Sequence, residues 1–402
     1  MRGRASISLA VVLGALASTM VLGLAQKAPC ASGDWGDLRQ YRMLCYSDLV
    51  PLYSTEQLQG DRLPFIDHCE GTCDEYPVLT MYTMRLVAWP VDSFFWFFYG
   101  NALVLAIAAG LAAFALYRAV GGRALYFALA PTLLIYGFVN WDLLPVALTA
   151  GATLQLVRRR DGWAGILLGL GAAAKLYPAF LLVPFAAERL RTKEPDRAGR
   201  LVFGAVAAWA VVNAPFVLTD TWSTFFRFNQ HRPADWDSLW FISCNPFGAA
   251  GCGNTNVVNL FSVIAFVAVS AVVWAVKVRR DPDMPRWKLG FPILVAFLLT
   301  NKVYSPQYGL WLLPWFALAL PDLRFFAAFE AADIAVFVTR FAYFGHLSGG
   351  ENGWTDAFTI GLFQVALLVR AAVLVACVVR FVLGTSRERV QRTSPAPEPA
   401  PA

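Results

Sequence analysis

The sequence predicts an all-α polytopic membrane protein with about twelve transmembrane helices. Hydrophobic residues make up 58% of the 402 residues and charged residues only 15%, whereas about 25% is usual in a soluble domain. The mean hydropathy is +0.53, and apolar stretches of roughly 17 to 25 residues, long enough to cross a bilayer, recur along the chain. These observations exclude a soluble globular protein, a disordered chain and a collagen-like fibre.

The expected helices follow the apolar runs in order, and several runs are shorter than a full bilayer crossing. The predicted spans are 7–25, 92–117, 124–139, 142–157, 162–174, 177–188, 201–219, 256–277, 289–301, 308–320, 325–344 and 356–383. The first span resembles a secretory signal peptide in its basic start. Its apolar stretch is long and no A-x-A site follows it, which favours an uncleaved anchor.

Basic residues give the orientation of these spans. With the N-terminus inside, most Lys and Arg residues fall in segments assigned to the cytoplasm, as the positive-inside rule requires. The net charge of +6 therefore reflects orientation in the lipid bilayer, and no nucleic-acid partner is expected. We expect a multi-pass protein of the plasma membrane.

Two long segments are assigned to the outer face, at about 26–91 and 220–257. The first is rich in Asp and Glu, and both exceed the length of ordinary connections between helices, which favours a function for them. The cytoplasmic loops are short and basic. The tail at 384–402 is rich in Pro and Ala, so we expect it to be disordered and cytoplasmic. The chemistry should therefore face outward.

Six of the seven cysteines lie in the outer segments, which suggests disulfides formed in an oxidising compartment. They are Cys30, Cys45, Cys69, Cys73, Cys244 and Cys252. The sequence-local pairing joins 30 to 45, 69 to 73 and 244 to 252, although six cysteines allow fifteen connectivities. A metal site at Cys69 and Cys73 beside His68 is the less favoured alternative, because zinc sites usually have a closer pair and a second pair of ligands. No metal site and no cofactor is predicted, although a divalent metal is not excluded.

Polar residues at the mouths of the spans are the next clue, because such residues are costly there and usually functional. Asp142 joins two spans, Lys175 lies where two short spans meet, and Lys302, Tyr304 and Gln307 form a similar turn. The simpler interpretation is that the two lysines extend to the interface from apolar surroundings. Outer lysines run against the positive-inside bias, which favours an anionic ligand instead.

A glycine-rich stretch, "GILLGLGAAAK" at 165–175, resembles a phosphate-binding loop only loosely. A true fingerprint needs a preceding strand and a different glycine spacing. Here the glycines lie inside an apolar span, where small residues allow helices to approach closely. Helix packing is therefore the preferred interpretation.

Six motifs occur in an order that resembles a known family. They are "CYSDLVPLY" (45–53), "DEYPVLT" (74–80), "NWDLLPVALT" (140–149), "AAAKLYP" (172–178), "ADWDSLW" (234–240) and "NKVYSPQYGLWLLPW" (301–315). Together they are similar to the actinobacterial polytopic glycosyltransferases of family 87, which have the GT-C architecture with a large outer first loop. The resemblance implies a transmembrane domain over 1–383 and transfer of a sugar, most simply mannose, from a polyprenyl-phosphate donor to a cell-envelope glycolipid or glycan. Family members carry an essential aspartate in the first outer loop, which places that role on Asp48.

The resemblance gives the polar residues candidate roles. Glycosyl transfer needs a carboxylate that accepts the proton of the acceptor hydroxyl, and cations that stabilise the leaving phosphate. Asp48 is the candidate base for an inverting transfer, although on composition alone it is one of many carboxylates in its loop. Candidate phosphate partners are Lys175, His231, Arg232 and Lys302; candidate substrate-binding residues are Asp67, Glu75, Asp142, Tyr177, Tyr304 and Gln307.

Other functions remain open from the sequence. A transporter or flippase for a lipid-linked sugar also fits many spans with broken helices, although no internal repeat is evident and the first loop is large. A non-catalytic assembly subunit is a third alternative. For an enzyme, the sequence leaves mannose, arabinose and glucose open as the donor sugar, and a phosphoinositide glycan, a polysaccharide end and a protein open as the acceptor. Production of a new glycolipid, as opposed to movement of a lipid, discriminates between enzyme and transporter.

Overall fold

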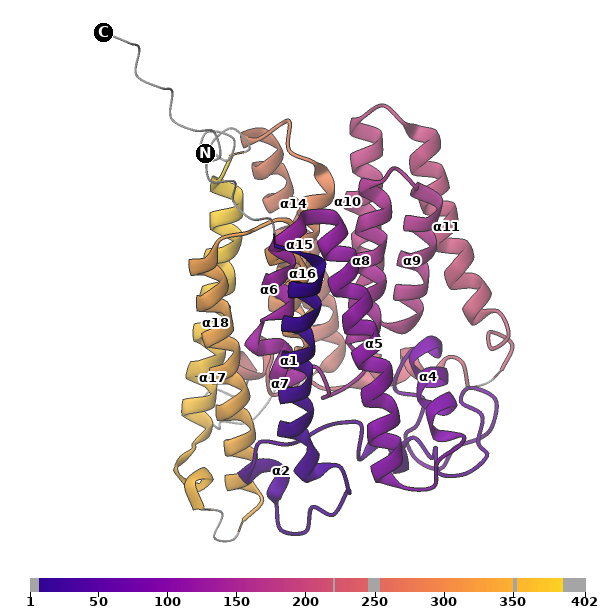
Figure 1. Cartoon of the computed structure of the whole chain (residues 1–402), viewed down its shortest axis with the longest axis vertical. Helices are drawn as coiled ribbons and strands as arrows, with labels where there is room; N and C mark the ends of the chain where they lie inside the picture. Colours follow the sequence, from indigo (N-terminus) through magenta and orange to yellow (C-terminus); the bar gives the residue numbers. More distant parts are fainter. Residues whose placement is uncertain (1–6, 220, 245–253, 350–352, 386–402) are drawn as a thin grey trace.

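The computed structural model describes residues 7–219, 221–244, 254–349 and 353–385. These residues form a helical bundle with loops gathered at one end (Figure 1). The helices are α1 (Leu9–Lys27), α2 (Arg39–Arg42), α3 (Leu52–Thr55), α4 (Val78–Ala88), α5 (Phe94–Val120), α6 (Leu125–Ala128), α7 (Pro131–Tyr136), α8 (Leu143–Val157), α9 (Asp161–Ala174), α10 (Pro178–Arg191), α11 (Pro195–Asn213), α12 (Thr224–His231), α13 (Leu239–Cys244), α14 (Thr255–Arg280), α15 (Gly290–Thr300), α16 (Leu313–Leu318), α17 (Leu323–Leu347) and α18 (Ile360–Leu383). Short 3₁₀ helices include η5 (Pro306–Trp311).

Every predicted span contains helix, but most of these helices are short. Among the described residues, four helical segments are long and apolar enough to cross a membrane by themselves: Leu9–Cys30, Phe94–Ala128, Thr255–Arg280 and Ile360–Leu383. The protein is thus an all-helical multi-pass membrane protein, while the total of twelve crossings stays a prediction. Proline explains part of the shortening, because Pro131 begins α7 and disfavours helical backbone at Ala130, which is extended.

The first long loop lies at one end of the bundle. Helix α1 packs beside α5, and the chain between them, with α2, α3 and α4, forms the lower end in Figure 1. The structure joins Cys30 to Cys45 and Cys69 to Cys73, which agrees with the sequence-local pairing. Cys252 lies outside the described residues, as does the tail from 386 onward.

Helices α9 and α11 approach so closely that only glycine fits between them. A Cβ atom on Gly165 would lie 2.0 Å from the carbonyl oxygen of Leu201, and one on Gly169 would lie 2.2 Å from that of Ala205. Small residues at this spacing allow backbone-to-backbone packing of membrane helices. The glycine-rich stretch is therefore a packing surface, as predicted, and the rigid helix pair fixes the turn that carries Lys175.

The orientation of the bundle can be tested with two exposed glycines. Gly60 lies in the first loop and Gly199 in α11, and a Cβ atom on either would meet no neighbouring atom within 4 Å. On intact cells, we expect a membrane-impermeant thiol reagent to label Gly60→Cys, while Gly199→Cys should react only after permeabilisation. The reverse pattern would place the first loop in the cytoplasm and contradict the predicted topology.

Candidate active site

A cavity of about 640 Å³ lies where the first loop meets the helix ends. It is lined by parts of the chain that are far apart in sequence: the first loop, the α9–α10 turn, α12, the α15–η5 turn and α17. Six of the sequence-predicted residues line it: Asp48, Glu75, Lys175, Arg232, Lys302 and Gln307. The fold therefore brings together charged residues from both outer segments and from two turns between short helices.

Asp48 is held by its backbone and by an aromatic neighbour. Its N–H donates to the carbonyl of Val139 at 2.8 Å, and the Ser47 hydroxyl donates to that of Phe138 at 2.6 Å. Burial raises the pKa of the Asp48 carboxyl, and a hydrogen bond from Tyr46 and the positive charge of Arg340 oppose that rise. The side chain is half-buried, so a fixed carboxylate with increased proton affinity faces the cavity.

Lys175 is already paired with a carboxylate. Its Nζ lies 3.2 Å from Oδ1 of Asp142 and about 5 Å from the ring centres of Tyr76 and Tyr308. The Trp311 indole N–H donates to the same Oδ1 at 2.9 Å. Asp142 thus lies directly behind the cavity wall, where it neutralises Lys175 and connects it to η5.

Tyr177 belongs to the same supporting layer. Its ring stacks on that of Trp311 with centroids 4.3 Å apart, and its hydroxyl shares a hydrogen bond with Thr149 at 3.2 Å. It is 1% exposed and does not line the cavity. Its position supports a role in holding Trp311 rather than in contacting substrate.

Arg232 and Lys302 are neighbouring cations of the cavity with different partners. Arg232 lies 3.6 Å from Oδ2 of Asp235, while Lys302 donates to the carbonyl of Gln230 at 3.0 Å. Burial, and then the nearby charge of Arg232, lower the pKa of Lys302 to about 8. Despite burial, the charges of Asp235 and Glu75 raise the pKa of Arg232. Lys302 is therefore the cation whose charged form is destabilised, and an anion beside it would be favoured.

Besides Asp142 and Tyr177, three further predicted residues lie away from the cavity lining. Asp67 is exposed and accepts the backbone N–H of Leu63 at 2.7 Å. His231 is exposed, with Nδ1 2.8 Å from the carbonyl of Arg227. Tyr304 is buried beneath the guanidinium of Arg370, 3.7 Å from its ring centre. Their positions give no direct support for substrate contact at this cavity.

The cavity also contains residues that the sequence reasoning missed. Arg340 of α17 lines it and forms an ion pair with Asp237 at 2.8 Å. A charge inside an apolar span is a recognised functional signal, so Arg340 could have been selected. Tyr46 and Asp235 lie in the motifs at 45–53 and 234–240, but neither is a charge inside an apolar span, so neither was selected within its motif.

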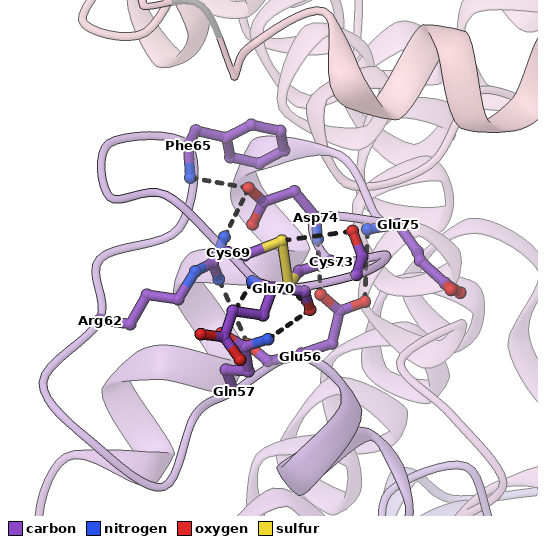
Figure 2. Close-up of a disulfide and its surroundings, with 10 residues drawn as sticks. Glu56, Gln57, Arg62, Phe65, Cys69, Glu70, Cys73, Asp74 and Glu75 are labelled. Atoms are coloured by element: carbon purple, nitrogen blue, oxygen red, sulfur yellow. Dashed lines mark hydrogen bonds and ion pairs between the residues drawn. A yellow bond between two sulfur atoms is a disulfide. The ribbon is translucent and has the colours of Figure 1, made fainter.

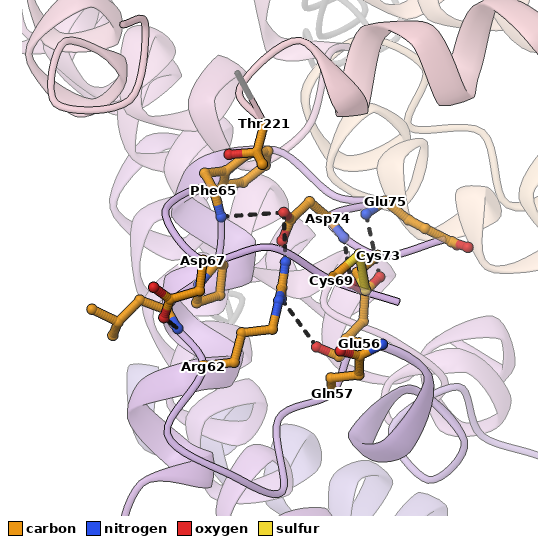
Figure 3. A network of polar contacts seen from close by, with 12 residues as sticks. Glu56, Gln57, Arg62, Phe65, Asp67, Cys69, Cys73, Asp74, Glu75 and Thr221 are labelled. Carbon is orange, nitrogen blue, oxygen red and sulfur yellow. Dashed lines mark hydrogen bonds and ion pairs between the residues drawn. A yellow bond between two sulfur atoms is a disulfide. The ribbon is translucent and has the colours of Figure 1, made fainter. Parts of the chain in front are cut away.

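A buried polar network fixes the loop segment that carries Glu75 (Figures 2 and 3). The Glu56 carboxylate accepts the backbone N–H groups of Asp74 at 2.6 Å and Glu75 at 3.3 Å. Asp74 in turn pairs with Arg62 at 2.7 Å and accepts the N–H of Phe65. With the Cys69–Cys73 disulfide, these contacts hold the cavity wall from inside the loop.

An apolar groove of about 480 Å³ joins the cavity. It lies among α9, α10, α11 and α12, and it shares Pro77, Leu176, Phe225 and Phe226 with the cavity. Leu176 and Val206 in its lining are more than half exposed, so the groove opens on the side of the bundle. Among the described residues, no cluster of three or more His, Cys, Asp or Glu side chains is arranged to hold a metal ion.

Fold and site together define a multi-pass membrane protein with a polar, charged cavity at one end of its helices and an apolar groove beside it. The sequence model "Glycosyltransferase family 87" matches residues 76–306, which is more than half of the chain. The chain therefore belongs to glycosyltransferase family 87, and it is a membrane glycosyltransferase. The match includes Lys175, Arg232 and Lys302, whereas Asp48 lies before it.

Similarity to other known proteins is limited. No curated protein matches the chain. Among solved structures, the crystal structure of ArnT from Cupriavidus metallidurans bound to undecaprenyl phosphate is similar, with 14% sequence identity, a TM-score of 0.44, and coverage of 93% of this chain and 78% of that chain. Similarity at that level assigns neither the fold nor the ligand.

Proposed function

We propose that this glycosyltransferase transfers a sugar, with mannose as the first candidate, from a polyprenyl-phosphate donor to a cell-envelope glycolipid or glycan on the outer face. One observation carries the proposal: a cavity containing the Asp48 carboxylate and the cations Arg232 and Lys302 opens directly into an apolar groove. A sugar phosphate attached to a lipid needs both environments side by side.

The apolar groove supports a lipid donor. Its lining includes Trp209, Trp222 and Phe225 together with small residues of α9, and charged side chains do not contribute to it. Burial of hydrocarbon against such a surface is worth about 25 cal/mol per Å², so a prenyl chain would gain by leaving the bilayer for the groove. A sugar on a water-soluble nucleotide would gain nothing there.

Arg232 and Lys302 are the best candidates for the donor phosphate. Lys175 shares its charge with the fully buried carboxylate of Asp142, whereas Lys302 has a carbonyl partner and Arg232 a carboxylate at 3.6 Å. An arriving phosphate would relieve the repulsion within the pair and would stay stabilised as charge develops on it in the transition state. This assigns Lys175 a smaller part than the sequence motifs suggested.

Asp48 is the proposed base. The acceptor hydroxyl oxygen attacks the anomeric carbon, Asp48 takes the hydroxyl proton, and the phosphate leaves with the electron pair of the broken C–O bond. A single displacement inverts the anomeric configuration. Glu75 is the competing carboxylate, since it lines the same cavity and burial also raises its pKa.

A transporter or flippase was the alternative from the sequence. Membership of a glycosyltransferase family favours the enzyme, and the hydrogen bonds that join Ser47 and Asp48 to the carbonyls of residues 138 and 139 support a fixed reactive group rather than a moving gate. The deciding product is a new glycolipid, made from a polyprenyl-phosphate sugar and an envelope lipid extract.

Replacement of the proposed base gives the first kinetic prediction. Asp48→Asn keeps the size and polarity of the side chain but removes the proton acceptor, so turnover should fall by about a hundredfold or more. Donor binding should persist, because the cation pair is untouched. Asp61→Asn, which changes an exposed carboxylate of the same loop, is the matched control. Near-normal turnover in folded Asp48→Asn, with loss in Glu75→Gln, would assign the base to Glu75.

The pH dependence tests the cation pair. Because the pKa of Lys302 is lowered to about 8, its charge is present below that pH and is lost as the pH rises through it. We expect kcat/KM for the donor, which reports the free enzyme, to decline above about pH 8. Lys302→Arg should remove this decline, since arginine stays charged. Arg232→Gln should move the decline to higher pH while lowering kcat/KM. An unchanged alkaline profile in both variants would exclude Lys302 from donor binding.

A further inference from the structure

Helix α12 divides the surroundings of the cavity into two compartments. Phe225 and Phe226 line the apolar groove and the cavity. Thr224, Arg227 and His231, with Phe228, line a second groove of about 680 Å³. These four positions are spaced by three, one and three residues, so they share one face of the helix. The helix therefore turns an aromatic face to the lipid-like groove and a mixed polar face to the second one.

The second groove leads into the cavity. It shares Thr72, Phe228, Arg232 and Asp235 with the cavity lining. One of these, Arg232, belongs to the proposed phosphate site. A molecule in the second groove would thus reach the reacting atoms from the side opposite the prenyl chain, with α12 between the two.

The chemistry of the second groove suits a sugar. Sugar hydroxyls both donate and accept hydrogen bonds, and the Arg232–Asp235 pair at the junction presents donors and acceptors together. Sugar C–H faces pack on aromatic rings, and the Trp236 ring is available there, braced by Phe241 with centroids 4.7 Å apart. The basic residues Arg227, His231 and Arg232 beside these apolar groups favour a ligand with polar groups over a bare hydrocarbon chain.

The opposite wall of the second groove is held rigidly. It is formed by residues 71–73, which end in the Cys69–Cys73 disulfide. The next residue in the chain, Asp74, donates its backbone N–H to the Glu56 carboxylate. The carboxylate of Asp74 pairs with Arg62 (Figures 2 and 3). A wall fixed in this way keeps its shape before a ligand arrives, which lowers the entropy cost of binding.

The geometry points to the second groove as the binding site for the glycan part of the acceptor, with α12 as the partition between acceptor and donor lipid. This inference rests on the proposed function and deepens it. It gives the acceptor a sugar next to the hydroxyl that reacts, and it places that sugar between α12 and residues 71–73.

Two engineered cysteines test the partition. Ala234 lines the second groove, Ala179 lines the apolar groove, and neither lines the cavity. Ala234→Cys and Ala179→Cys are modified with a bulky methanethiosulfonate after purification, so that the obstruction is introduced into folded protein. The probes are an envelope lipid extract as acceptor and the polyprenyl-phosphate sugar that the wild type uses, chosen from mannose, glucose and arabinose.

Modification at position 234 should raise the extract concentration needed for half-maximal transfer by roughly tenfold or more and leave the donor Kd within about twofold. Modification at position 179 should raise the donor Kd by roughly tenfold or more and leave the extract concentration needed for half-maximal transfer within about twofold. In protection experiments, the extract should slow labelling of the cysteine at 234 but not at 179. The donor should slow labelling of the cysteine at 179 but not at 234. Wild-type protein treated with the reagent gives the background.

The possible results distinguish failure of the acceptor groove from failure of the proposed function. Normal acceptor dependence after modification at 234, or protection of that cysteine by the donor alone, overturns the acceptor groove and leaves the proposed function standing. If the wild type transfers no sugar from any of the three donors, the proposed function fails. Protection at 234 by the extract would still show that the groove binds envelope glycans.

Discussion

The Asp142 carboxylate is the point on which the candidate site depends. One oxygen accepts the Trp311 indole N–H at 2.9 Å and faces the Lys175 ammonium at 3.2 Å, so a single buried group joins the start of α8, the α9–α10 turn and η5. Breaking a buried ion pair by removing one partner costs about 3–5 kcal/mol, because the remaining charge is stranded. The short helices of this bundle are therefore tied together at the very turns that line the cavity.

Charge compensation then distinguishes structural cations from candidate ligand-binding ones. Lys175 and Arg340 each have a buried aspartate within 3.2 Å, and both groups contribute to the field around Asp48. Lys302 has a backbone carbonyl as its hydrogen-bond partner, and burial and the charge of Arg232 lower its pKa, whereas Arg232 has Asp235 at 3.6 Å. The same cavity thus holds a carboxylate on one side and an incomplete anion site on the other, which is the charge pattern that transfer from a sugar phosphate requires.

Much of this arrangement was predictable because its signals are local. Lys175 and Lys302 were selected because they are outer lysines at breaks between apolar runs, and Asp48 was selected because of the motif around it. All three residues line the cavity. Side-chain direction has no such local signal, either in the first loop, where Asp67 lies, or at the end of α12, where His231 lies, and both residues are outside the cavity lining. Arg340 had a local signal, a charge inside an apolar span, but its ion pair with Asp237, about a hundred residues away in the chain, could not be predicted from one sequence.

The number of membrane crossings also depends on contacts that a single sequence does not reveal. Apolar runs located the helices, but whether a run of 11 residues such as α15 crosses a bilayer depends on what it packs against rather than on its own hydropathy. Likewise, the close approach of α9 and α11 follows from Gly165 and Gly169 only once Leu201 and Ala205 are known to lie opposite them.

The most direct test of the account is an experimental structure with polyprenyl phosphate bound. We expect the phosphate to lie between Arg232 and Lys302, and the prenyl chain to pass Phe225 and Phe226 into the groove of α9, α10 and α11. A phosphate bound at Lys175 instead, or a prenyl chain lying along the Arg227 and His231 face of α12, would contradict it.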